Sequence, residues 1–150
     1  MSCVLSIIGE NLDIDTFISQ TNIPGFNIKH KGDPITLVSN KKAKHSSASI
    51  ITSDADFDDI KGQISDTINF LNKYRDNLKH IVNTPEIEYA TINFGVDSII
   101  DEAHLIQSFY FTPELVKICG SLGIGIELST YKEDMQLILE KRRASKGRKS

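Results

Sequence analysis

The clearest pattern in the chain is a stripe of apolar residues that recur every three or four positions through its middle. The stripe consists of Phe57, Ile60, Ile64, Ile68, Leu71, Tyr74, Leu78 and Ile81. This spacing is the period of an amphipathic α-helix, so it predicts one long helix over residues 57–81. Ser53 or Asp54 can cap the start of this helix, and Pro85 ends it.

Shorter apolar runs on both sides of the stripe are typical of β-strands. They predict strands over residues 3–8, 47–52, 88–94, 104–111 and 124–129, with two short extended pieces at 26–29 and 35–38. Thr112-Pro113-Glu114 is a helix start, with a cap, a proline at the first helical position and an acid. Gly123 is suited to end that helix. A short helix capped by Asn11 or Asp13 and a last helix over 131–143 complete the pattern.

The order of these elements predicts an α+β fold. From about residue 47 to 130 it is strand, helix, strand, strand, helix, strand, which is the βαββαβ order of the ferredoxin-like sandwich. We expect an antiparallel-rich sheet with helices packed on one face. The first forty residues add an N-terminal β-α-β-β extension. The chain is therefore interpreted as one domain over 1–143, with a disordered basic tail over 144–150.

The predicted central helix is longer than the sheet that it must cover. About 26 helical residues span roughly 39 Å, whereas a strand of six or seven residues spans roughly 23 Å. Tyr74, Leu78 and Ile81 therefore need another neighbour. It can be the C-terminal helix, the first forty residues, or a second copy of the chain in a homodimer.

Charge is distributed unevenly along the chain. Six of the 17 basic side chains lie in the last ten residues, whereas all 20 acidic ones precede residue 141. The part before residue 141 thus holds 11 basic against 20 acidic side chains, a balance of −9. An acidic body repels nucleic acid and attracts a basic partner, so we expect a protein partner rather than a nucleic acid. No apolar run approaches the roughly 20 residues that span a bilayer, so we expect no membrane partner.

Known catalytic and metal-binding motifs are absent from the sequence. Asp54-x-Asp56-x-Asp58 resembles a calcium loop, but Asp59 and Ser65 stand where that loop needs glycine and glutamate. The histidines have no metal-ligand spacing, and no nucleophile or phosphate-loop motif occurs. Cys3 and Cys119 stand alone and are expected to be reduced core thiols. We therefore predict no enzyme activity, no cofactor and no metal.

Two segments carry a resemblance to a known family. A strand that ends in Gly9 is followed by the Leu12-Asp13 start of a helix, and Pro113-Glu114-Leu115 leads through Leu122-Gly123 to a strand ending at Tyr131. This pattern, over residues 3–131, resembles the bacterial domain-of-unknown-function family 4279. That family has no established activity, so the resemblance transfers no functional residue. Such small acidic domains are also similar to bacterial immunity proteins, which neutralise a toxin by binding it.

The leading hypothesis is a non-catalytic, cytoplasmic protein-binding domain, of the kind that neutralises a basic toxin domain. Its partner surface is expected to include the carboxylates Asp54, Asp56, Asp58 and Asp59. A domain that binds a small ligand or acts as an enzyme is the second hypothesis, and it predicts a deep pocket. The third hypothesis is a self-associating scaffold that uses Tyr74, Leu78 and Ile81.

Overall fold

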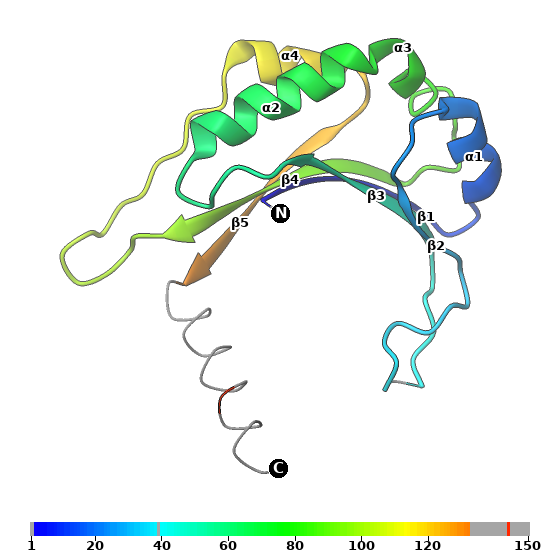
Figure 1. Ribbon diagram of the computed structural model, residues 1–150, viewed down its shortest axis with the longest axis horizontal. Helices are drawn as coiled ribbons and strands as arrows, with labels where there is room; N and C mark the ends of the chain where they lie inside the picture. The colour runs from blue at the N-terminus through cyan, green and yellow to red at the C-terminus, as the bar shows by residue number, and fades with distance from the viewer. Residues whose placement is uncertain (1, 39, 133–143, 145–150) are drawn as a thin grey trace.

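A five-stranded sheet organises the chain, and its helices cover one face (Figure 1). The computed structural model describes residues 2–38, 40–132 and 144. Its elements are β1 (Cys3–Gly9), α1 (Ile14–Thr21), β2 (Asn27–Lys29), β3 (Ser46–Ser53), α2 (Ile60–Lys73), α3 (Arg75–Leu78), β4 (Tyr89–Ser98), α4 (Pro113–Ser121) and β5 (Gly125–Lys132). The predicted α+β class is confirmed.

The sheet has the strand order β2-β3-β1-β4-β5. β1 lies in the middle and is antiparallel to both neighbours, β3 and β4. β2 pairs antiparallel with β3, and β5 adds to β4 in parallel, joined to it through α4. A parallel pair needs such a crossover because the chain must return to the same end of the sheet.

Burial alternates along β1. Cys3, Leu5 and Ile7 are fully buried beneath the helices, whereas Val4 and Ser6 are only partly buried. Successive side chains of a strand point to opposite faces, so this pattern places the core on one side of the sheet. Within the described part of the chain, no helix covers the opposite face (Figure 1).

The prediction of a single helix over 57–81 is wrong. α2 begins at Ile60 and ends at Lys73, and the chain turns at Tyr74 (φ −108°, ψ 20°) before the short α3. The turn packs α3 against α1, where Asn77 Nδ2 donates a hydrogen bond to the carbonyl oxygen of Thr21 at 2.8 Å.

The predicted strand over 104–111 does not form, so the ferredoxin-like order βαββαβ is not confirmed. Both edges of β4 are already paired, with β1 and with β5. In place of the backbone hydrogen bonds of a strand pair, the side chain of Gln107 connects this segment to the end of β4. Gln107 Nε2 donates to the carbonyl oxygen of Asp97 at 2.8 Å, and Gln107 Oε1 accepts from the Ile99 N–H at 3.1 Å.

Smaller differences lie at the borders of other elements. Residues 35–38 form a turn rather than the predicted extended piece, so the N-terminal extension has one short strand instead of two. β4 continues to Ser98, and β5 continues to Lys132, which is where the last predicted helix was to begin. The rest of that helix and, apart from residue 144, the predicted tail lie outside the described residues.

Two threonines and a cysteine beneath α2 contact one another. The Thr67 hydroxyl donates to Cys3 Sγ at 3.3 Å and also lies 2.9 Å from the Thr52 hydroxyl, which links α2 to β1 and β3. Both Cys3 and Cys119 are free and buried, and burial raises the pKa of the Cys119 thiol to about 11. Such thiols are inert packing residues, because the thiolate is the reactive form. None of the described helices is both long and apolar enough to cross a membrane.

Candidate binding groove

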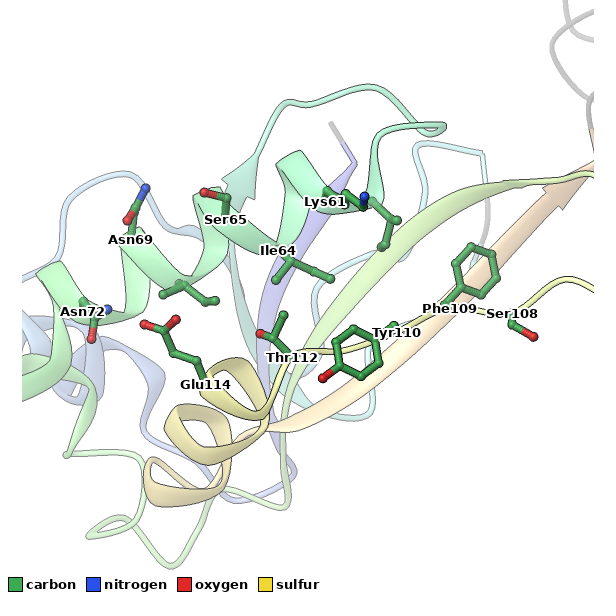
Figure 2. A pocket seen from close by; sticks show the side chains of 12 residues that line it. Lys61, Ile64, Ser65, Asn69, Asn72, Ser108, Phe109, Tyr110, Thr112 and Glu114 are labelled. Atoms are coloured by element: carbon green, nitrogen blue, oxygen red, sulfur yellow. The ribbon is translucent and has the colours of Figure 1, made fainter.

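A groove lies between α2 and the segment that leads into α4, and it encloses about 620 Å³ (Figure 2). We call it the α2 groove. Its lining residues are Ile60, Lys61, Ile64, Ser65, Ile68, Asn69, Asn72, Ser108, Phe109, Tyr110, Thr112 and Glu114. The three isoleucines are buried or partly buried and form an apolar floor, whereas the polar residues of α2 are exposed and form a rim.

The wall opposite α2 is held in place at its C-terminal end by two neighbouring residues. Phe111 packs against Phe94 in the core, with ring centroids 5.3 Å apart. Thr112 caps α4, where its side-chain oxygen accepts from the Leu115 N–H at 3.3 Å. Tyr110 directly precedes these two residues and is 73% exposed at the mouth of the groove.

The four carboxylates predicted to bind a partner lie in the turn that precedes α2, and all four are exposed. We call Asp54, Asp56, Asp58 and Asp59 the acidic turn. Asp59 also caps α2, because its Oδ1 accepts from the Gly62 N–H at 2.9 Å. The acidic turn runs directly into Ile60, the first residue of the groove floor.

The helix-end residues proposed for self-association have neighbours in the same chain. Leu78 and Ile81 are buried within the core. The Tyr74 ring packs on Phe70 with centroids 5.0 Å apart, and Lys73 Nζ lies 5.1 Å from the Tyr74 ring centroid. Of the three neighbours considered for this end of the stripe, the first forty residues are the one that the structure places beside it, through α1.

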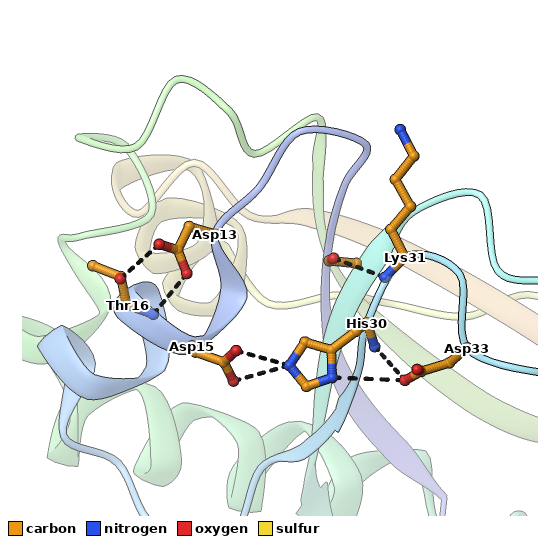
Figure 3. Close-up of polar contacts among 7 residues, drawn as sticks. Asp13, Asp15, Thr16, His30, Lys31 and Asp33 are labelled. Carbon is orange, nitrogen blue, oxygen red and sulfur yellow. Dashed lines mark hydrogen bonds and ion pairs between the residues drawn. The ribbon is translucent and has the colours of Figure 1, made fainter.

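His30 lies between two carboxylates on separate elements (Figure 3). Its Nε2 is 2.8 Å from an oxygen of Asp15 on α1, and its Nδ1 is 3.6 Å from Asp33. The hydrogen bond to Asp15 and the charges of Asp15 and Asp33 raise the pKa of His30 above its usual value. Because Asp15 lies on α1, the contact with His30 Nε2 ties α1 to the loop after β2.

Sequence reasoning missed two sets of residues. Phe109 and Tyr110 were placed in a strand, although they line the groove. The strand prediction rested on the aromatic character of these residues. Aromatic residues also form the wall of a groove, so this signal did not distinguish the two. Glu10, His45 and Glu88 gather at the other end of β3 from the acidic turn, with ligand atoms within 4.8 Å of one another. No local spacing could indicate this cluster, because its members come from three separate parts of the chain.

Comparison with known proteins places the chain in a family. It matches no curated protein and no solved structure. Residues 1–133 match the family described as Domain of unknown function (DUF4279). The match extends from before β1 to the end of β5 and so covers the whole sheet and the helices between its strands. The chain therefore belongs to the DUF4279 family of domains of unknown function.

Proposed function

We propose that this chain is a non-catalytic protein-binding domain whose partner is a basic protein surface with one apolar anchor. The observation that carries the proposal is the continuity of the acidic turn with the α2 groove. Four exposed carboxylates end at Asp59, and the next residue, Ile60, begins the apolar floor. Charge and apolar surface are thus adjacent where the acidic turn meets the first residue of the groove floor.

The two parts of this surface have different physical roles. An aromatic or aliphatic side chain that fills the groove would remove the exposed parts of Ile60 and Ile68 from water, and apolar burial contributes about 25 cal/mol per Å². Central apolar anchors of this kind usually dominate the affinity of an interface. The carboxylates of the acidic turn add selectivity for a basic partner and a faster rate of encounter.

The acidic body favours one form of this proposal. The balance of −9 before residue 141 complements a strongly basic protein such as a nuclease-type toxin domain. In that form the chain is a cytoplasmic immunity protein that occupies the surface of the toxin. Co-expression of the chain then restores growth of cells that produce the toxin, and the double substitution Asp56→Asn with Asp58→Asn removes this protection.

The proposal is tested by site-specific crosslinking in the native host. A photo-crosslinking amino acid replaces Tyr110 at the mouth of the groove or, as a matched control, Tyr89 on the open face of the sheet. These tyrosines are similarly exposed, at 73% and 64%. We expect a basic protein to be captured from position 110 and not from position 89. Capture of the same proteins from both positions would contradict the proposal.

The captured protein is then purified and its affinity for the full chain is measured. We expect Asp56→Asn with Asp58→Asn to weaken binding at least tenfold, and Tyr110→Ala to weaken it further. Asp59 is kept because it caps α2.

The control Glu86→Gln with Glu127→Gln removes the same charge elsewhere and should leave the affinity within about twofold. The difference between the two pairs should shrink from about 50 to about 500 mM salt, since ions screen exposed charges. Equal effects of both pairs would rule out the acidic turn as the contact.

A further inference from the structure

We propose that Glu10, His45 and Glu88 form a site for a divalent first-row transition metal ion such as Zn²⁺. The ligand atoms of these side chains lie within 4.8 Å of one another at one end of the sheet. The acidic turn that leads into the α2 groove follows β3, whereas His45 precedes β3. The site and the groove therefore lie at opposite ends of this strand. The inference is therefore independent of the proposed protein-binding surface.

The sheet register brings the three ligands together. Gly9 pairs with Ser46, and Ile8 pairs with Tyr89. The residues just beyond these pairs are Glu10 after β1, His45 before β3 and Glu88 before β4. Because β1 lies between the other two strands, its C-terminal end is flanked by the N-terminal ends of both neighbours.

Gly9 permits the close approach that positions Glu88. A Cβ atom at Gly9 would lie within van der Waals overlap of the Glu86 carbonyl oxygen, so the segment before β4 can cross here only over a glycine. The Glu88 N–H donates to the carbonyl oxygen of Ile8 at 2.9 Å, and the Glu10 N–H donates to Glu88 Oε2 at 3.3 Å. The backbone thus fixes the Glu88 carboxylate beside Glu10.

The geometry and the donor set suit a metal of borderline hardness. His45 Nε2 lies 3.5 Å from Glu88 Oε2. Two ligands bound tetrahedrally to zinc at about 2.1 Å are separated by roughly 3.4 Å, so this pair already has the required spacing. The Glu10 side chain is exposed and can reach the same point by a rotamer change. One imidazole and two carboxylates favour such a metal over a purely oxygen-bound cation.

Solvent can complete the coordination. A hollow of about 270 Å³ adjoins the cluster and is lined by Asn11, Pro85, Glu86 and Glu88. Lys31 is the competing group, because its Nζ lies 3.2 Å from Glu10 Oε1. An ion pair between exposed side chains is worth little, so a metal ion can displace the ammonium group. Metal binding and the Lys31 contact are therefore expected to exclude each other.

Calorimetric titration of the chain over residues 1–150 with ZnCl₂, in a buffer free of phosphate and chelators, tests the site. We expect one Zn²⁺ per chain. Glu88→Gln and His45→Ala should each lower the Zn²⁺ affinity by about 100-fold. Removal of a residue that only hydrogen-bonds to a metal ligand already costs about 10–100-fold in metal affinity, so the loss of a ligand itself should cost no less. Glu88→Gln keeps an oxygen for the Glu10 N–H, so the fold should persist, which circular dichroism checks.

The matched control is His104→Ala, because His104 also lies beside a carboxylate, with Nδ1 3.0 Å from Asp101. This variant should bind Zn²⁺ like the unaltered chain. Lys31→Ala should tighten binding severalfold, since it removes both a competitor for Glu10 and a positive charge. The proposal is overturned if the chain takes up no Zn²⁺, if Glu88→Gln and His45→Ala leave the affinity unchanged, or if Lys31→Ala fails to raise it.

Discussion

Gln63 Nε2 donates a hydrogen bond to the carbonyl oxygen of Gly95 at 2.8 Å, and this bond joins α2 to β4 inside the core. The same nitrogen donates to the carbonyl oxygen of Asp56 at 3.1 Å, so the buried amide also holds the acidic turn. Gln63 Oε1 has no hydrogen-bond partner among the described residues. The amide orientation is set by its two acceptors, because an oxygen could not donate to either carbonyl.

Gln63→Glu should therefore be strongly destabilising. A carboxylate at this position has no N–H for the two carbonyl oxygens, and its burial penalises the charged form. We expect a loss of about 3 kcal/mol or more in the free energy of unfolding, measured by urea denaturation. Gln63→Met, which removes the hydrogen bonds without adding an acid, should cost less. An acidic variant as stable as the methionine variant would contradict this account.

Gly95→Ala should destabilise the chain through a steric conflict. A Cβ atom at Gly95 would lie 2.5 Å from Cε1 of Phe57, a residue that also packs edge-on against Tyr131. Overpacking of this kind costs about 1–3 kcal/mol. Phe57→Leu should relieve the conflict, so a double-mutant cycle should show that the two substitutions cost less together than their sum.

Gly120→Ala is the matched control for this glycine. Gly120 lies within α4, and an added Cβ there would meet no atom within 4 Å. Alanine is favoured over glycine in a helix, so thermal denaturation should show a chain that is more stable by about 0.5–1 kcal/mol. Equal losses at both glycines would show that local contacts do not decide the effect.

Leu78→Ala should lower stability without any change of mass in solution. Leu78 is fully buried in the core of its own chain, and truncation of such a leucine costs about 2–5 kcal/mol. Val116→Ala on α4, where the side chain is 52% exposed, should cost much less. The unfolding midpoint of Leu78→Ala should not depend on protein concentration. A midpoint that rises with concentration would instead place Leu78 at an interface between copies.

The contact of His30 with Asp15 should make part of the stability depend on pH. Hydrogen bonding and charge raise the pKa of His30 above 6.5, so the folded chain holds this proton more tightly than the unfolded chain. The contribution is complete below the unfolded pKa and is lost as pH rises through the raised folded value. The unfolding free energies of the unaltered chain and His30→Gln should differ more at about pH 5.5 than at about pH 9. A difference that grows with pH would refute this.

Residues close to the helix ends in the sequence predicted where α1 begins and where α4 begins and ends. Asp13 caps α1, Thr112 caps α4, and Gly123 follows α4 with a positive φ of 71°. Each of these features rests on contacts within three or four residues, which the sequence displays directly. The alternating strand around Ile92 was likewise visible, because period-two burial needs no knowledge of the partner strands.

The sequence by itself determined where β1, α1, β3, α2, β4, α4 and β5 lie along the chain, although not that residues 104–111 stay outside the sheet. Only the tertiary structure decided that the helical stripe turns at Tyr74, that the aromatic segment before Thr112 becomes a groove wall, and that Glu10, His45 and Glu88 meet. The physical reason is that these features depend on how long the sheet is, which strand edges are already paired, and which strand ends are neighbours. Such properties belong to the assembled sheet and to no single stretch of residues.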